Sequence, residues 1–199
     1  MNHYEEFYYQ PAVRFNVNMS FLGIALSFIY FDWIRTFAGL ILGIFLFTVF
    51  EYFAHRYVHH HYALAVFKNA HLKHHHDSED IQHLFFSNRV GSIYCLILTI
   101  LLWLVVNDLS ISTAMLTGIL LYNFYAQWWH FVAHRPITPG TAWGRRMKDR
   151  HLWHHEENGI INFGVSQPYI DYLLGTSGTG TAFAHSNEHI NHPEVKKTR

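Results

Sequence analysis

Four long apolar runs limit how this chain can fold. A helix needs roughly twenty apolar residues to cross a bilayer, so the first run fits only if it begins near Phe15, and the short third run requires thinning of the bilayer or burial in protein. Charged residues make up 14% of the chain, against about a quarter in an average soluble protein. We therefore expect an all-α integral membrane protein with four transmembrane helices in two hairpins, at residues 19–31, 36–54, 91–106 and 111–131.

The basic residues predict the orientation of these helices. Of the 14 Lys and Arg residues, only Arg35 falls on the two short turns between paired runs, and the others lie with the termini and with clusters of histidine. Basic residues favour the cytoplasmic side of a membrane, so both hairpins are expected to deliver their histidines to that face. A soluble bundle of four buried helices is the alternative, but no run shows the alternating apolar and charged faces that such helices need.

The histidine clusters are the strongest functional signal in the sequence. Residues three and four apart share one face of a helix, and convergent neutral imidazoles suit iron, zinc, copper or nickel. His55 shares a face with His59, and it converges with His60 only if the helix ends near them. The formal net charge of zero gives no electrostatic case for a nucleic-acid partner. The clusters lie at residues 55–61, 71–76, 130–134 and 151–155.

The spacing of these histidines has a counterpart in a known family. The series reads His55-x4-His60, His71-x2-His74-His75, His130-x3-His134 and His151-x2-His154-His155. It resembles the histidine boxes of the fatty acid hydroxylase/sterol desaturase superfamily, which are membrane-bound di-iron oxygenases. The likeness extends from Glu51-Tyr52 to the segments 162–166 and 171–176, and it covers roughly residues 45–176. It implies a cytosolic, histidine-rich helical cap on the four helices and oxygen-dependent attack on a lipid C–H bond.

The resemblance also implies the cofactor and the residues that bind it. Two iron ions are expected; zinc is possible in purified protein, but it has no redox chemistry with which to activate oxygen. His59, Glu51 and Asn158 are expected to support a ligand or to replace one, and Asp171 to fix the fold of the cap. The ten implied ligands are His55, His60, His71, His74, His75, His130, His134, His151, His154 and His155.

The implied reaction needs electrons from outside the chain. The sequence has no flavin or nicotinamide motif and a single cysteine, so no bound haem, flavin or NAD is expected. An external donor similar to cytochrome b5 or to a ferredoxin is implied. The basic face predicted to receive it comprises Arg145, Arg146, Lys148 and Arg150.

The resemblance leaves several substrates open. The residues after the second box, 77–80, are mildly similar to the fatty acid hydroxylase branch, which favours hydroxylation, or desaturation, of a fatty acyl or sphingolipid chain. Sterol, carotenoid and alkyl-ether oxidases share these boxes and remain alternatives. A histidine-rich membrane metal transporter is the alternative from another class, but transport sites lie near the bilayer midplane, whereas these histidines gather at one end of the runs.

Residues 1–176 are predicted to form a single membrane-embedded domain, followed by a flexible tail at residues 177–199. The basic end of the tail, residues 196–199, is similar to a dilysine retrieval signal of the endoplasmic reticulum, and a bacterial inner-membrane protein is equally compatible with it. In both cases the site would lie on the cytoplasmic face. The tail also carries three histidines with the spacing of an auxiliary metal site, His185, His189 and His192.

Overall fold

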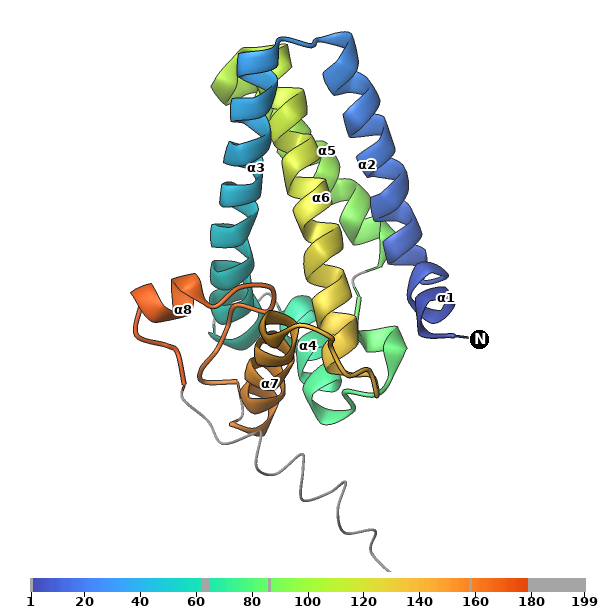
Figure 1. Ribbon diagram of the computed structural model, residues 1–199, viewed down its shortest axis with the longest axis vertical. Helices are drawn as coiled ribbons and strands as arrows, with labels where there is room; N and C mark the ends of the chain where they lie inside the picture. The colour runs from blue at the N-terminus through green and yellow to red at the C-terminus, as the bar shows by residue number, and fades with distance from the viewer. Residues whose placement is uncertain (1, 62–64, 86, 158, 179–199) are drawn as a thin grey trace, which may run out of the picture.

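Helices make up the regular structure of this chain. The computed structural model describes residues 2–61, 65–85, 87–157 and 159–178, and these residues contain helices and no strand, as predicted for an all-α protein. Four long helices run alongside one another and carry the shorter helices at one end (Figure 1). The long helices are α2 (Pro11–Ile29), α3 (Trp33–Phe53), α5 (Asn88–Val106) and α6 (Leu109–Ala133).

Capping residues explain why α3 and α6 start earlier than the corresponding apolar runs. The carboxylates of Asp32 and Asp108 accept hydrogen bonds from the backbone N–H groups of Arg35 at 2.9 Å and of Ile111 at 3.0 Å, which caps α3 and α6. Asn107 ends α5 in the left-handed conformation, with φ of 50°. An ion pair of 3.1 Å between Arg35 and Asp108 joins the two turns at this end of the molecule.

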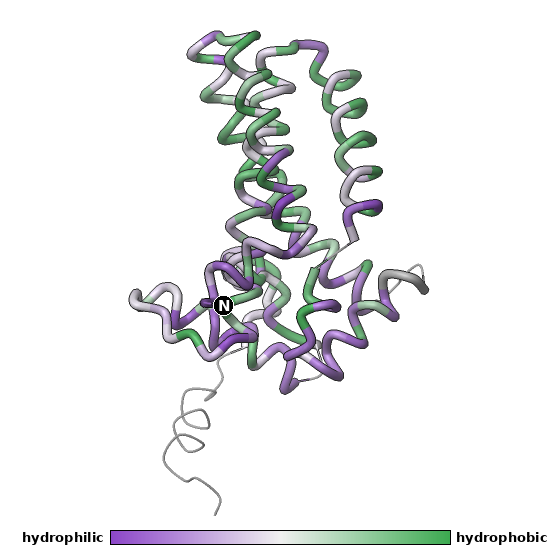
Figure 2. The backbone as a smooth tube through the Cα atoms, turned by 90° about the vertical axis from the view of Figure 1, so that its right-hand side faces the viewer, coloured by the Kyte–Doolittle hydropathy of each residue, from purple (hydrophilic) through white to green (hydrophobic). Residues whose placement is uncertain are grey.

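The central long helix is α6, which packs against α2, α3 and α5. In the 18-residue apolar stretch of α6, 56% of the residues are buried. In the corresponding stretches of the other three long helices the buried share is 28% or less, so those helices turn most of their apolar side chains outward. Figure 2 shows hydrophobic residues along the long helices and hydrophilic residues at the end that carries the short ones. All four are long and apolar enough to cross a membrane, and such an outer surface suits lipid.

Two glycines allow α3 and α6 to approach closely. A Cβ atom at Gly43 would collide with the carbonyl group of Met115, and one at Gly118 would collide with the carbonyl group of Leu40. Lipid tails are as apolar as the side chains, so membrane helices associate largely through close van der Waals packing. Small residues at the contact allow this close packing.

The short elements gather at the polar end of the long helices (Figure 1). There, α7 contacts α6, α8 contacts α3, and α4 contacts the π-helix that continues α3. The predicted arrangement as two hairpins and the cytosolic location of this end remain predictions. Of the predicted tail only residues 177 and 178 are described, so His185, His189 and His192 lie outside the described residues. The short elements are α1 (His3–Tyr8), a π-helix (Ala54–His61), α4 (Ala65–His76), a 3-10 turn (Ile81–His83), α7 (Ala142–Glu156) and α8 (Tyr169–Leu173).

The close contact of α3 with α6 can be tested with one methyl group. Gly43→Ala should destabilise the protein by about 1–3 kcal/mol, because the added carbon has no space between the two helices. Gly140→Ala is the matched control, since a Cβ there meets nothing within 4 Å. Thermal unfolding of the detergent-solubilised variants measures both effects. Equal unfolding temperatures for the two variants would argue against the close contact.

Candidate metal centre

Ten histidine side chains converge in two groups of five at the polar end of the long helices. Within each group, one ring nitrogen from every histidine lies within 4.8 Å of the others, and among the described residues both groups consist of imidazoles alone. Together they contain the ten residues that the sequence resemblance implies as ligands. The first group is His55, His60, His71, His75 and His154, and the second group is His74, His130, His134, His151 and His155.

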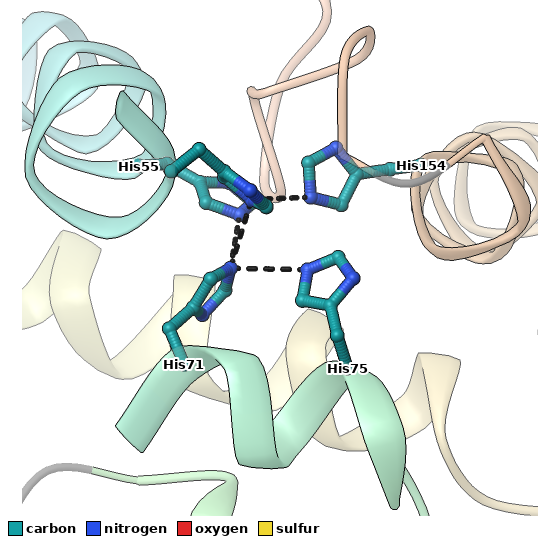
Figure 3. Close-up of side chains that lie close together, drawn as sticks. His55, His71, His75 and His154 are labelled. Atoms are coloured by element: carbon teal, nitrogen blue, oxygen red, sulfur yellow. Dashed lines mark hydrogen bonds between the residues drawn. The ribbon is translucent and has the colours of Figure 1, made fainter. Parts of the chain in front are cut away.

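The first group is built by the π-helix, α4 and α7. The Nε2 atom of His71 lies 3.2 Å from that of His55, 2.9 Å from that of His60 and 3.0 Å from that of His75. The Nε2 atom of His154 lies 3.1 Å from that of His60. Figure 3 shows the rings of His55, His71, His75 and His154 pointing toward one another from three separate parts of the chain.

A π-helix at the end of α3 brings His55 and His60 to the same side. The sequence predicts that His55 and His60 converge only if the helix ends near them, but the chain instead widens into a π-helix over Ala54–His61. Hydrogen bonds in a π-helix run from residue i to residue i+5, so residues five apart come to lie on one side. His55 and His60 therefore both enter the first group, whereas His59 belongs to neither group, although its ring lies 4.9 Å from that of His71.

The second group is built by α4, the end of α6 and α7. The Nε2 atom of His74 lies 2.9 Å from that of His130. The Nε2 atom of His151 lies 2.9 Å from that of His134 and 3.2 Å from that of His155. His130 is in the last turn of α6 and His134 caps its end, so this helix brings two histidines to the group at the point where it leaves the apolar region.

Helix phase divides α4 and α7 between the two groups. His71 and His75 are four residues apart on α4 and face the first group, whereas His74 faces the second. On α7, His151 and His155 face the second group, whereas His154 faces the first. The rings of His75 and His155 stack with their centroids 4.0 Å apart, so the two groups are neighbours.

Burial keeps these imidazoles neutral, as metal ligands must be. It lowers the pKa of His75 to about 4 and the pKa values of His134 and His154 to about 3. Desolvation is again the largest cause of the lowered pKa of His151, and neighbouring imidazoles add to it. At neutral pH these four histidines therefore present lone pairs and not positive charges.

Comparison with known families identifies the class of protein. Residues 40–176, more than half of the chain, match the family described as fatty acid hydroxylase. The chain belongs to the fatty acid hydroxylase family. A comparison with curated proteins found no match.

One solved structure has a similar fold. The fold of this fatty acid hydroxylase family member is similar to that of a structure described as "Full length scs7p (only hydroxylase domain visible)", with a TM-score of 0.73. The sequences are 23% identical, and the match covers 82% of this chain and 64% of that chain. The chain thus spans less than two thirds of the length of that protein, and the likeness concerns the fold.

The two groups have the chemistry of a transition-metal site. The Nδ1 atoms of His55 and His154 lie 2.6 Å from the backbone carbonyl oxygens of Phe163 and Ile161. A carbonyl oxygen only accepts, so both Nδ1 atoms carry the proton and both Nε2 atoms are bare lone pairs. Lone pairs that face other nitrogens at about 3 Å favour a cation between them, and all-imidazole sets suit iron, zinc or copper.

Glu51 and Asn158 were expected to support the ligands. The nearly buried carboxylate of Glu51 accepts hydrogen bonds from the backbone N–H of Ser166 at 3.2 Å and from its hydroxyl group at 2.7 Å. Glu51 therefore holds the segment after α7, which also contains the carbonyl groups of Ile161 and Phe163. Asn158 lies outside the described residues.

The predicted basic face is wrong in one residue. The side chain of Arg150 is 7% exposed and donates hydrogen bonds to Asp171 at 3.2 Å and to Ser177 at 2.8 Å. A buried guanidinium needs such partners, and this pairing removes Arg150 from the surface. Arg145 and Lys148 are half-buried and donate hydrogen bonds to backbone carbonyl groups, so Arg146 is the most exposed residue of the predicted face.

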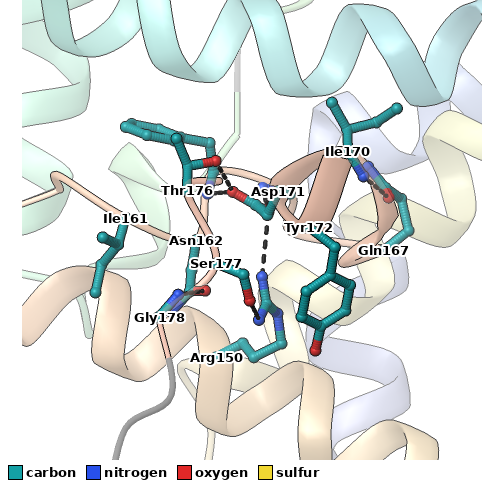
Figure 4. A network of polar contacts seen from close by, with 12 residues as sticks. Arg150, Ile161, Asn162, Gln167, Ile170, Asp171, Tyr172, Thr176, Ser177 and Gly178 are labelled. Carbon is teal, nitrogen blue, oxygen red and sulfur yellow. Dashed lines mark hydrogen bonds and ion pairs between the residues drawn. The ribbon is translucent and has the colours of Figure 1, made fainter. Parts of the chain in front are cut away.

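Asp171 is a residue whose contribution the sequence showed only in part. It was expected to fix the fold, and it is fully buried between Arg150 and Thr176 (Figure 4). Its carboxylate also accepts hydrogen bonds from the backbone N–H groups of Phe163 and Gly164 at 2.8 Å. Its place in a motif after the last box marks it as important. The motif does not show that its bonds reach the segment that touches His55 and His154.

The choice between His59 and His60 can be tested by metal content. His60→Ala should lower the metal content by about one ion per chain, because it removes an inward-facing Nε2 atom from the first group. His59→Ala is the matched control and should leave the metal content unchanged. Elemental analysis of both variants, purified side by side, gives the result. The opposite pattern would show that His59 is the ligand.

Proposed function

We propose that this protein is a membrane-bound di-iron hydroxylase that inserts an oxygen atom into a C–H bond of a lipid. The observation that carries the proposal is the pair of adjacent five-imidazole groups at the polar end of four apolar helices. Membership in the fatty acid hydroxylase family supports an oxidoreductase with a lipid substrate. A fatty acyl or sphingolipid chain is the preferred substrate, and sterol, carotenoid and alkyl-ether oxidation, or desaturation, are the alternatives.

Each group would hold one iron ion. Iron bound by the five imidazoles of each group would supply the activation of O2. The protein's own contribution is to hold the ten Nε2 atoms in place, to keep the rings neutral by burial and to limit water near them. The family's use of iron and the all-nitrogen groups favour iron over zinc, which has no redox chemistry.

The reaction needs reducing equivalents. One atom of O2 enters the C–H bond and the other leaves as water, which consumes two electrons and two protons from outside the substrate. The chain carries a single cysteine, so it cannot hold a cysteine-ligated iron–sulfur cluster. An external donor of the cytochrome b5 or ferredoxin type is therefore part of the proposal.

The membrane arrangement is the remaining part of the proposal. The four apolar helices support two pairs of spans. The basic residues that accompany the histidines support the cytoplasmic face for this end, and we propose the endoplasmic reticulum or a bacterial inner membrane as the location. A metal transporter is less well supported, because transport sites lie near the bilayer midplane. The histidines here lie at the ends of α3 and α6 and on α4 and α7, away from the middle of any long helix.

Iron content and isotope incorporation together test the proposed function. Gently purified protein should contain about two iron ions per chain, as expected for ten imidazole ligands. With a reductant, a donor and isotopically labelled O2, a fatty acyl or sphingoid lipid should gain one labelled oxygen atom by mass spectrometry. His154→Ala should retain less iron and form less product. Protein without bound iron, or iron-loaded protein that labels no lipid of any class named above, would refute the proposal.

The docking of the donor gives a separate prediction. Arg145→Glu with Arg146→Glu should slow electron delivery several-fold at low salt, because charge reversal repels an acidic donor. Iron content should not change. Arg89→Glu, a charge reversal at an exposed residue at the start of α5, is the control. Stopped-flow reduction by cytochrome b5 or ferredoxin measures the rate, and equal rates in all three proteins would exclude this docking face.

A further inference from the structure

We propose that Asp171 is a positioning residue that orients His55 and His154 through the backbone of the segment 161–164, and that it thereby makes the first metal site distinct from the second. The inference rests on the proposed ligation of metal by the two histidine groups. It assigns to a residue outside the boxes, and in contact with neither ring, control over one of the two sites.

Backbone carbonyl groups orient two histidine rings of the first group. The Nδ1–H groups of His55 and His154 donate to the carbonyl oxygens of Phe163 and Ile161, both at 2.6 Å. This bond fixes the tautomer and the rotation of each ring, and it makes the Nε2 atom a better electron donor. Two of the five members of the first group are thus set by one short stretch of chain.

That stretch has no regular secondary structure and needs another support. The backbone N–H of Phe163 donates to Oδ1 of Asp171 and that of Gly164 donates to Oδ2, both at 2.8 Å. Thr176 Oγ1 adds a bond of 2.8 Å to Oδ1, and Arg150 adds one of 3.2 Å to Oδ2. Figure 4 shows the carboxylate between Arg150 and Thr176. Each oxygen therefore accepts two bonds, and the side chain is fully buried.

The second group lacks this support. The Nδ1 atoms of His74, His151 and His155 are buried and have no hydrogen-bond partner among the described residues. These three rings are held instead by contacts with one another and with His130 and His134 at the end of α6. The two sites therefore differ in ligand orientation and basicity, although both consist of five imidazoles.

A purely structural role for Asp171 predicts a different outcome. Loss of its bonds would then weaken the whole polar end, including the contact of α7 through Arg150, and both sites would lose metal together. A positioning role affects the first site and leaves the second intact. The experiment must therefore observe each metal separately.

Mössbauer spectroscopy of the full-length protein loaded with iron-57 makes this distinction. Wild-type protein should give two ferrous quadrupole doublets of equal area, and His154→Ala and His134→Ala assign them to the first and second site. Asp171→Asn keeps the size of the side chain but places an NH2 group against two donors. It should weaken iron binding at the first site by about 10- to 100-fold, as for other residues that orient metal ligands, with the second doublet unchanged.

Two milder variants keep the test decisive if Asp171→Asn folds poorly. Thr176→Val removes one of the four bonds to Asp171 and should shift the same doublet by less. Ser177→Ala is the matched control, because it removes a bond from Arg150 in the same region but none from Asp171. Equal loss of both doublets, or two unchanged doublets, in the folded variants overturns the inference. Wild-type protein that binds no iron overturns the proposed function itself.

Discussion

Neutral imidazole nitrogens lie 2.9–3.2 Å apart in the two groups, and such short separations require that each ring be held rigidly. The helices that carry the histidines provide this rigidity. Helices α4 and α7 each supply three histidines. The α-helical period points these side chains in different directions around the helix axis, so each helix contributes to both groups. The π-helix adds two residues five apart, which an α-helix would turn to different sides. The histidines thus depend on helix geometry as much as on their own chemistry.

The long helices form the base on which these supports rest. Helix α6 is the most buried of the four, and it contacts α7 as well as the other long helices. It therefore fixes where the second group lies relative to the apolar helices. The close approach at Gly43 and Gly118 fixes α3 against α6. Since α3 continues into the π-helix, the same contact also fixes the start of the first group.

Much of this arrangement could be predicted because it follows from local periodicity. Apolar length predicted the four candidate spans. Spacings of four predicted histidines that share a group, such as His71 and His75, but the expected convergence of histidines three apart was wrong, because His71 and His74 lie in different groups. The π-helix could not be predicted, because a spacing of five between His55 and His60 also fits a helix that ends. Arg150 was misplaced on the surface because its burial depends on Asp171, which is distant in sequence. The carbonyl partners of His55 and His154 carry no side-chain signal at all.

The segment after α7 explains why the family match continues to residue 176, beyond the last histidine box. Ser166 satisfies the carboxylate of Glu51 in an otherwise apolar helix, and the hydroxyl groups of Tyr52 and Thr176 lie 2.9 Å apart. An unpaired carboxylate would be costly at that depth, so the helix needs the segment. The segment in turn needs Asp171 to hold its backbone. Membrane helix, irregular segment and first histidine group are therefore mutually dependent, and a change in any one should be felt in the other two.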